Sequence, residues 1–375
     1  MLTAESETIA APVKSLKAKR SDMPAVWSER YRTTATLPLV QAASEALPRV
    51  SVVIPTRGRP ELAQRALRSV LAQAFESFEI VVVIDGPDHE TGETLRGFRD
   101  ERLHVVHLGE SVGGSEARNI GVRFSRGEWI AFLDDDDEWY ADKLEKQWAL
   151  AVSIREKYAL VASQFVERTG DAERVLPGRM PANGEAFSEY LFVRRGWESG
   201  EGFLQTSTWF VSRALMLKVP FTRDLKRCQD LDWLVHATAL PGVGVRIVPE
   251  ILAVFHHDDC RSRVSRTPDW RFLYSWALTN KRYLTPRAFS FFLATFCAPS
   301  AAKQREGAAS FLFLLRSCVG HGSASTKCLL LFLICWWIPE NRRRGLRAKY
   351  HGLRSGMTRR GSDLDRGPAP RKATI

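Results

Sequence analysis

Hydrophobic residues in the first part of the chain recur in two patterns that alternate along the sequence. Short runs rich in β-branched residues predict buried strands at 50–54, 79–84, 103–107 and 129–133. Between these runs, apolar residues recur at helical spacing, which predicts helices over 60–73, 91–100 and 114–126. Strands that alternate with helices predict a mostly parallel sheet with right-handed crossovers, as in nucleotide-binding α/β folds.

The pattern is less regular in the second part of the chain, where strands and helices no longer alternate. After a long predicted helix at 143–157, strand-like runs occupy 159–163, 205–211, 245–248 and 251–256. One helix is predicted over 229–239, and the stretch 171–202 is rich in loop residues. We expect this α+β half to supply the contacts with an acceptor.

Beyond Trp270 the composition becomes strongly apolar. The runs 289–296, 308–315 and 328–338 are each shorter than the roughly 20 residues that span a bilayer. Two interpretations stay open at this stage. Apolar helices beside Arg and Lys clusters can make a peripheral membrane contact, or they can pack on the preceding domain and leave a solvated basic tail.

These patterns divide the chain into four predicted segments. We expect a mobile N-terminal segment at 1–47 and one α/β domain at 48–270, with a nucleotide-binding half (48–150) and an acceptor half (151–270). The domain is followed by an apolar helical region at 271–350, which either associates with a membrane or packs on the domain. The last predicted segment is a basic disordered tail at 351–375.

Charge and cysteine usage narrow the function without deciding it. The 375-residue chain has a formal net charge of +11, which favours a polyanionic partner such as nucleotide phosphates, nucleic acid or an anionic membrane. No nucleic-acid module with interleaved basic and aromatic residues accompanies the charge, so we expect no nucleic acid partner. Six cysteines without a CxxC pair, and no apolar core of a secretory signal in 1–49, favour a reducing cytoplasmic location.

Four consecutive aspartates, Asp134 to Asp137, end the predicted strand at 129–133, and we call them the acidic tip. Adjacent carboxylates repel one another unless a cation lies among them. Carboxylate oxygens suit Mg²⁺ or Mn²⁺, and ligands of open α/β sheets bind beyond the carboxyl ends of the strands. The acidic tip therefore predicts a metal–phosphate site, although Asp137 alone is also interpretable as the cap of the helix that follows.

Several motifs in series now resemble one known family. They include Val50-Ser-Val-Val-Ile-Pro-Thr, Arg59-Pro-Glu, Ser69-Val-Leu-Ala-Gln, Gly114-Ser-Glu-Ala-Arg-Asn-Ile-Gly and Gly127-Glu-Trp-Ile-Ala-Phe-Leu-Asp-Asp-Asp-Asp-Glu-Trp. Residues 49–270 resemble family-2 glycosyltransferases of the GT-A fold, a nucleotide-diphospho-sugar transferase fold with a Rossmann-like, mostly parallel sheet. The resemblance implies a metal-dependent, inverting transfer of a sugar from a nucleotide diphosphate to an acceptor hydroxyl, in cell-envelope or exopolysaccharide biosynthesis. A C-terminal helical appendage would follow this domain.

The resemblance also implies roles for individual residues. Asp134 and Asp136 match the family's aspartate-x-aspartate motif and would hold Mg²⁺ or Mn²⁺ on the donor diphosphate, with His256 or His257 as a third ligand. Asp230 would be the catalytic base, with Asp232 the second choice and helix-start charge the structural alternative for both. The implied nucleotide-sugar contacts are Pro55, Thr56, Arg57, Asp85, Arg118, Asp135, Arg261 and Arg263.

Four positions in these motifs depart from the family pattern or have a structural alternative. Arg57 stands where an aromatic residue is usual, and Gln229 replaces a common Glu before Asp230. Asp85, preceded by Ile84 rather than by a second aspartate, is also a plausible turn residue. Arg118 would pair with either the donor phosphates or the carboxylates as a structural ion pair.

Two other functions agree less well with the sequence than glycosyl transfer does. A nucleotidyltransferase also uses metal-binding aspartates on an α/β fold, but the chain lacks the Gly-x-Gly signature with a basic residue after the first strand. An inactive nucleotide-sugar-binding relative is disfavoured by the presence of Asp134, Asp136 and Asp230. The expected partners are a nucleotide-sugar donor and a saccharide or lipid-linked acceptor, at the cytoplasmic face of the cell membrane or in the cytoplasm.

Overall fold

The structure is a computed structural model that describes residues 47–170, 172–256, 269–339 and 342–343 of the chain. Contacts divide the chain into two compact units. Unit 1 takes its described residues from Met1–Leu191 and Gly200–Arg266, and unit 2 from Phe192–Ser199 and Thr267–Ile375.

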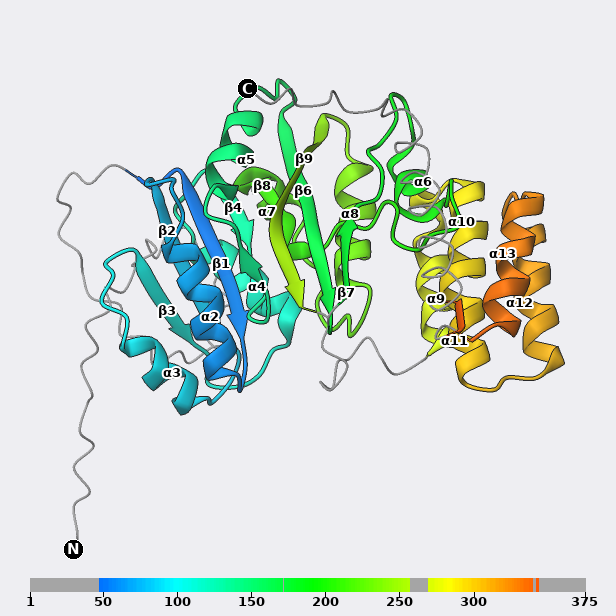
Figure 1. Ribbon diagram of the computed structural model, residues 1–375, viewed down its shortest axis with the longest axis horizontal. Coiled ribbons are helices and arrows are strands. Elements are labelled where there is room, and N and C mark those ends of the chain that lie inside the picture. Colours follow the sequence, from blue (N-terminus) through cyan, green and yellow to red (C-terminus); the bar gives the residue numbers. More distant parts are fainter. Residues whose placement is uncertain (1–46, 171, 257–268, 340–341, 344–375) are drawn as a thin grey trace, which may run out of the picture. The chain divides into compact units, whose positions relative to one another are not determined.

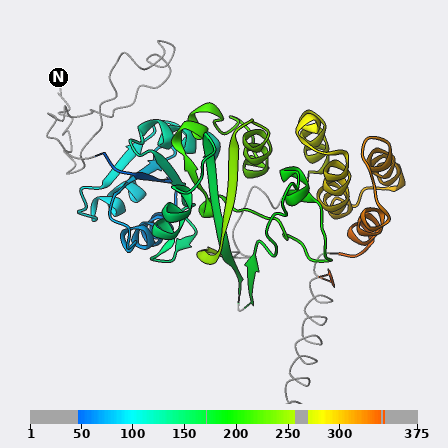
Figure 2. The same ribbon diagram turned by 90° about the horizontal axis from the view of Figure 1, so that it is seen from above.

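Within the described residues, unit 1 is built on one mixed sheet of nine strands (Figures 1 and 2). Their order is β3-β2-β1-β4-β8-β6-β9-β5, and β7 pairs with β6 beside this path. The strands are β1 (Val50–Thr56), β2 (Phe78–Ile84), β3 (Leu103–His107), β4 (Trp129–Phe132), β5 (Glu138–Trp139), β6 (Tyr158–Thr169), β7 (Ala172–Leu176), β8 (Phe210–Ser212) and β9 (Val243–His256).

Strand direction changes across the sheet. β1 is parallel to β2 and β4, and β2 is parallel to β3, as the alternating pattern predicts. β8 is antiparallel to both β4 and β6, whereas β6 and β9 are parallel, so the second half mixes both directions. The parallel half places the carboxyl ends of β1, β2 and β4 at one edge, where a ligand site is expected.

Helices cover both faces of this sheet, because the strand residues are apolar on both sides. Val52 and Ile54 pack in one core with α2 (Pro60–Leu71), α3 (His89–Arg96) and α5 (Lys143–Ala151). Val53 and Val81 face the other side, toward α4. That side is covered by α4 (Gly114–Phe124), α7 (Arg213–Lys218) and α8 (Gln229–Thr238), and unit 1 also contains the short η2 (Thr206–Thr208). Burial on both faces is typical of parallel sheets.

Two glycines let α4 and its following turn approach β1 closely. A Cβ atom on Gly121 would lie 2.3 Å from Val53 Cγ1, and one on Gly127 would lie 2.7 Å from Ser51 backbone nitrogen. This close packing fixes α4 against the strand and so fixes the position of every polar side chain that α4 carries toward the sheet edge.

Two predictions about the second half are wrong in detail. The runs 245–248 and 251–256 form one strand, β9, whose pairing with β6 is irregular around Ser163–Phe165, opposite the proline that separates the two runs. The predicted helix 143–157 ends at Ala151, and Asp137 does not cap it, since the two-residue strand β5 lies between them. Asp137 is instead fully buried.

Unit 2 is helical, as the apolar runs predict. It contains α9 (Trp270–Thr279), η4 (Lys281–Tyr283), α10 (Pro286–Phe292), η5 (Leu293–Cys297), α11 (Ala298–Lys303), α12 (Ala308–Gly320) and α13 (Thr326–Trp337). The helix α6 (Phe187–Phe192) belongs to unit 1 except for its last residue, Phe192, which is the first residue of unit 2. The rings of Phe192, Trp276 and Phe292 pack together in its core. Among the helices described, none is both long and apolar enough to cross a membrane.

Candidate active site

The acidic tip directly follows β4 at the carboxyl edge of the parallel strands. The amide of Leu133 still donates to the Val53 carbonyl at 3.1 Å, so the strand pairing continues to the residue before the tip. The Asp137 amide then donates to the Asp134 carbonyl at 3.1 Å and closes a turn. The four aspartates are thus held on one tight turn at the position where open α/β sheets bind their ligands.

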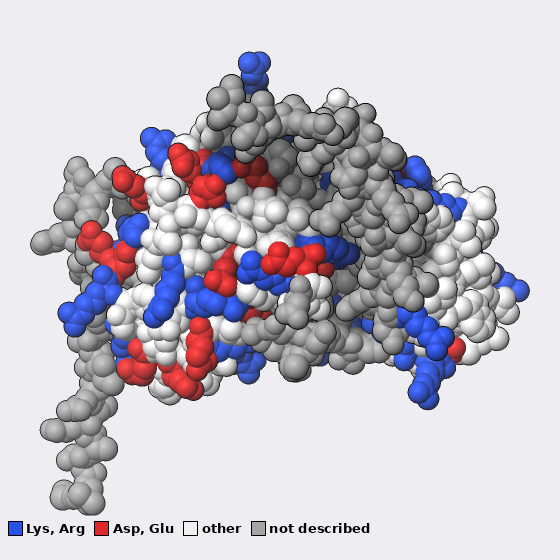
Figure 3. Space-filling model, viewed as in Figure 1, with Lys and Arg blue, Asp and Glu red and all other residues white. Residues whose placement is uncertain are grey.

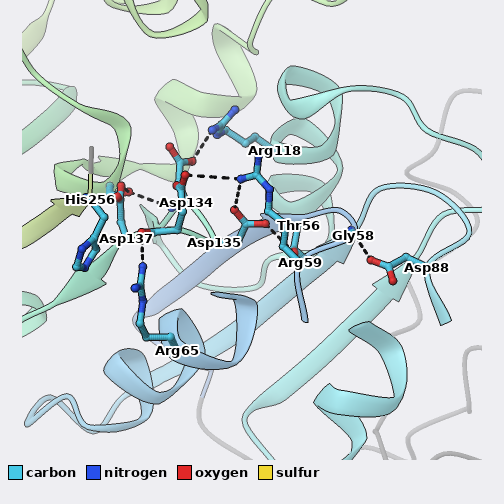
Figure 4. A network of polar contacts seen from close by, with 12 residues as sticks. Thr56, Gly58, Arg59, Arg65, Asp88, Arg118, Asp134, Asp135, Asp137 and His256 are labelled. Atoms are coloured by element: carbon cyan, nitrogen blue, oxygen red, sulfur yellow. Dashed lines mark hydrogen bonds and ion pairs between the residues drawn. The ribbon is translucent and has the colours of Figure 1, made fainter. Parts of the chain in front are cut away.

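Asp134 is paired with Arg118, as one of the two interpretations of Arg118 predicts (Figure 4). Arg118 reaches the Asp134 carboxylate through Nη2, and its Nη1 donates to Gln229 Oε1 at 3.2 Å. The guanidinium is buried, and its Nε has no hydrogen-bond partner among the residues that the structure describes. One side chain of α4 therefore joins the acidic tip to the first residue of α8.

Asp230 lies next to this connection, so the predicted base and the predicted metal ligand share one cation. Burial raises the pKa of Asp230, the nearby Arg118 guanidinium opposes this shift, and the Asp134 charge adds to it. The Arg118 charge is in turn favoured by both Asp134 and Asp230. The structure brings together two carboxylates that lie far apart in the sequence.

Asp232, the second choice for the base, has a different environment. It is buried, and its Oδ2 accepts a hydrogen bond from Thr222 Oγ1 at 2.6 Å. The same oxygen lies 3.5 Å from His236 Nδ1 one turn further along α8. These contacts give Asp232 a structural role at the start of α8, on the side where α8 packs.

Asp135 faces the end of β1 and the start of α2. Its Oδ2 accepts from Thr56 Oγ1 at 2.8 Å, and its Oδ1 accepts from Arg59 Nη1 at 3.0 Å. Arg59 also lies 3.6 Å from Asp136 Oδ2. Burial raises the pKa of Asp135 to about 6, Arg59 opposes the shift, and the charges of Asp136 and Asp134 add to it.

Asp137 holds the acidic tip to the second half of unit 1. Its Oδ2 accepts from Ser207 Oγ at 2.7 Å and from Gln205 Nε2 at 2.6 Å, and its Oδ1 accepts from the His256 amide at 3.3 Å. Burial raises its pKa well above the usual range, and Asp136 and Asp134 raise it further. Asp137 therefore links the acidic tip to the segment around η2 and to the end of β9.

His256 is placed beside the tip, but its ring points to a different partner. Its Nε2 lies 2.7 Å from Glu138 Oε1, and Glu138 also lies 3.4 Å from Arg65 Nε. In the part of the chain that the structure describes, no three His, Cys, Asp or Glu side chains form a group that could hold a metal ion. A role for His256 as a third ligand stays a prediction, and His257 lies outside the described residues.

The carboxylates of the tip nevertheless fit a magnesium-type ion. Mg²⁺ is usually held by one or two carboxylates together with water and substrate phosphates, so a site of three protein ligands is not required. The Asp134 and Asp136 side chains are 25% and 13% exposed, which leaves both reachable from solvent. The charges of Asp136 and Asp134 also raise the pKa of Asp135, and this repulsion between neighbouring carboxylates is a further reason to expect a cation here.

The residues predicted to contact the nucleotide lie at the same edge of the sheet. Asp85, at the end of β2, accepts from the amides of Val112 and Gly113 at 2.6 and 3.0 Å and from Ser111 Oγ at 2.9 Å. Arg57 Nη1 donates to the same Ser111 hydroxyl at 2.8 Å. Asp85 thus fixes the loop that begins α4, in agreement with its structural alternative, and a base or ribose contact stays a prediction.

Of the four remaining positions predicted to contact the nucleotide, the structure describes two. Pro55 and Thr56 lie at the end of β1, and Thr56 contacts Asp135. Arg261 and Arg263 lie outside the described residues, so their predicted diphosphate contacts stay predictions.

Sequence reasoning missed five residues that shape this site. They are Arg59, Arg65, Glu138, Gln205 and Ser207. The two arginines were accessible to prediction, because basic residues at the start of the helix after β1 lie near the end of β4 once β1 and β4 pair. Gln205 and Ser207 had no such signal, since only the antiparallel β4–β8 pairing brings them to the tip.

Comparison with known proteins agrees with this geometry. Residues 51–215 match the family model described as glycosyl transferase family 2. The chain carries a family-2 glycosyltransferase domain. The match includes β1, the acidic tip and β8, and it decides against the nucleotidyltransferase alternative.

Named relatives of this glycosyltransferase domain act in polysaccharide assembly. The amylovoran biosynthesis glycosyltransferase AmsB of Erwinia amylovora is 27% identical over 214 residues, which cover 55% of this chain and 69% of AmsB. The UDP-Glc:alpha-D-GlcNAc-diphosphoundecaprenol beta-1,3-glucosyltransferase WfgD of Escherichia coli is 33% identical over 98 residues, 26% of this chain and 39% of WfgD.

A solved structure supports the fold. The crystal structure of S. aureus TarS 1-349 in complex with UDP-GlcNAc aligns with a TM-score of 0.51 at 16% identity, covering 79% of this chain and 92% of that chain. Together with the family match, this confirms the GT-A fold that the motifs predict.

Proposed function

We propose that this chain transfers a sugar from a nucleotide diphosphate sugar to an acceptor hydroxyl with inversion at the anomeric carbon. The observation that carries the proposal is the buried Arg118, which contacts Asp134 at the acidic tip and interacts electrostatically with Asp230 on α8. An inverting displacement needs a leaving-group site and a base on opposite sides of the reacting carbon. Asp134 and Asp230 supply one carboxylate for each.

The acidic tip would hold the leaving nucleotide diphosphate. Asp134 and Asp136 are the residues that would bind a divalent cation, which supplies Lewis-acid stabilisation of the negative charge on the diphosphate. Arg59, 38% exposed and within reach of Asp135 and Asp136, is placed to share this task once phosphate oxygens compete for its guanidinium. Arg118 keeps Asp134 oriented from the buried side.

Asp230 would remove the acceptor proton. As the acceptor oxygen forms its bond to the anomeric carbon, the hydroxyl proton passes to the Asp230 carboxylate, and the bond from the anomeric carbon to the diphosphate oxygen breaks. A base is most effective when its pKa is not far below the working pH, and burial raises the pKa of Asp230 in that direction. Asp232, already bonded to Thr222 and near His236, is less suited to this step.

We propose a saccharide carried on a lipid diphosphate as the acceptor, in envelope or exopolysaccharide biosynthesis. Two relatives support this class: WfgD is named for transfer to a GlcNAc-diphosphoundecaprenol, and AmsB for amylovoran biosynthesis. The basic net charge of +11 is compatible with both a diphosphate donor and a lipid diphosphate acceptor.

A donor screen with product analysis tests the proposal. The purified full chain is incubated with a panel of UDP-, GDP- and dTDP-sugars, with a synthetic lipid-diphosphate saccharide, and with Mg²⁺ or Mn²⁺. We expect release of a nucleoside diphosphate from one donor and a product whose new glycosidic bond has the anomeric configuration opposite to the donor's, as read by NMR. A retained configuration, or no release from any donor, would contradict the proposal.

A further inference from the structure

The outward sides of α12 and α13 expose large apolar side chains. On α12, Leu312, Phe313 and Val319 are 47%, 45% and 54% exposed. On α13, Leu330, Leu333 and Trp337 are 45%, 41% and 70% exposed. Steps of three and four positions place the α13 set on one stripe of its helix. On α12, Leu312 and Val319 are two helical turns apart and share one side, with Phe313 next to Leu312. We call these six residues the outer face.

Both helices use their opposite sides to pack within unit 2. Leu314 and Cys318 of α12 are buried, as are Leu331 and Cys335 of α13, and both helices contact η5 or α11. Phe311 joins the two helices, with ring centroids 5.1 Å from Trp336 and 5.5 Å from Phe332. Phe313 is partly packed within unit 2 as well, since its ring centroid lies 5.0 Å from that of Tyr274 and 6.2 Å from that of Trp270, both on α9. The other residues of the outer face are exposed on sides of α12 and α13 that these contacts leave open.

The charge of these two helices has one sign. From Gly307 to Pro339 the sequence contains Arg316 and Lys327 but no Asp or Glu. Arg316 lies in a depression of about 440 Å³ together with Leu312, Phe313 and His321. It is exposed and has no hydrogen-bond or ion-pair partner among the described residues. In Figure 3 the visible surface of unit 2 is mostly white, with a few blue side chains and a small area of red.

We propose that the outer face docks on the surface of an anionic lipid bilayer, with α12 and α13 lying in the plane of the interface. At about 1.5 Å per residue, helices of 13 and 12 residues are much shorter than the roughly 30 Å hydrocarbon core, so they can enter the interface but not cross it. Apolar side chains enter the acyl boundary, Trp337 suits the interfacial region, and Arg316 meets a lipid phosphate.

A second copy of the chain fits the outer face less well. A protein contact between two such faces would take both Arg316 side chains out of water without any carboxylate on the same two helices to pair with them. A lipid headgroup supplies that negative charge. Docking on a bilayer would bring the enzyme to a lipid-linked acceptor, and this purpose alone rests on the proposed function.

Vesicle binding of the full-length protein tests the outer face. The wild type and a Leu312→Asp/Leu333→Asp variant are floated with vesicles of phosphatidylglycerol and phosphatidylcholine, or of phosphatidylcholine alone. We expect the wild type to bind the anionic vesicles, more weakly at high salt, and the variant to lose at least tenfold in its partition coefficient. Both substitutions are at exposed positions, so folding should survive, which circular dichroism checks.

A matched control places the same charges on exposed apolar residues of unit 1. Val152→Asp/Leu217→Asp alters side chains that are 58% and 51% exposed and should bind vesicles like the wild type. Equal binding by the outer-face variant, or no wild-type binding, would overturn the proposal, as would a wild-type dimer that the variant dissociates in light scattering. Nucleotide release from a soluble donor should be unchanged in the outer-face variant, so a failure here is distinguishable from a failure of the proposed function.

Discussion

Units 1 and 2 depart from the usual distribution of residues in opposite ways. Unit 1 buries charge, since Asp135, Asp137 and Arg118 all lie inside it around the acidic tip. Unit 2 exposes apolar surface, with Trp337 the most exposed side chain of the outer face. Both arrangements cost stability relative to the ordinary one. This difference agrees with the two proposals, which place the chemistry in unit 1 and attachment to a lipid surface in unit 2.

The largest effect that would sharpen this division is expected at Asp230. Asp230→Asn keeps the shape but removes the proton acceptor, so we expect glycosyl transfer to fall by about 10²–10⁴-fold. Binding of the nucleoside diphosphate, measured by calorimetry, should change little. Asp224→Asn is the control, because Asp224 is exposed and its φ of 59° is one that asparagine also adopts. Full transfer by Asp230→Asn would refute the assignment.

The next largest effect is expected at the acidic tip. Asp136→Asn should weaken Mn²⁺ binding, measured by electron paramagnetic resonance without donor, and lower transfer by about two orders of magnitude through lost charge stabilisation. Asp137→Asn should instead lower thermal stability, because Asp137 is buried among Gln205, Ser207 and the His256 amide. If both variants lose only stability, the tip is a structural cluster and the division between units fails.

A smaller effect concerns pH. Asp230 acts as a base only when ionised, and its pKa is raised by burial, so kcat/KM should fall as pH decreases through that raised value. Arg118 opposes the shift, so Arg118→Met should move the acidic limb to higher pH by about one unit or more. Arg118→Lys retains the charge and should restore most of the position of the limb. If the acidic limb of the kcat/KM profile does not move in Arg118→Met, Arg118 does not influence the pKa of the base.

The smallest effect is one of packing alone. Gly121→Ala would place a Cβ atom 2.3 Å from Val53 Cγ1, which should cost about 1–3 kcal/mol of unfolding free energy. Gly109→Ala has no atom within 4 Å of the new Cβ and is the control. Chemical denaturation checks both. Vesicle binding by unit 2 should not respond to either substitution, and a response would break the separation of the two units.

The parallel half of unit 1 was the part most predictable from sequence. Strands buried on both faces read as continuous apolar runs, and β3 (Leu103–His107) has the predicted bounds. The second half was less predictable because its elements depend on pairing between distant segments. β5 has only two residues, and it exists because Glu138 and Trp139 pair with β9.

The candidate site shows the same limit. The position of Asp134 and Asp136 at the end of β4 followed from the sequence, because a strand's carboxyl end is a local feature. The burial of Asp137 did not follow, since its partners Gln205, Ser207 and His256 come from η2 and β9. Four identical side chains in a row carry no local sign of which of them faces inward.

The contacts of Asp137 have a consequence for the mobility of unit 1. Through Asp137, one buried carboxylate ties the end of β4 to η2 and to the end of β9. Opening the two halves like a hinge at this point would expose an unpaired buried acid and is therefore costly. We therefore expect a donor to enter a largely preformed site, with exposed side chains such as Arg59 moving aside and the two halves of unit 1 keeping their positions.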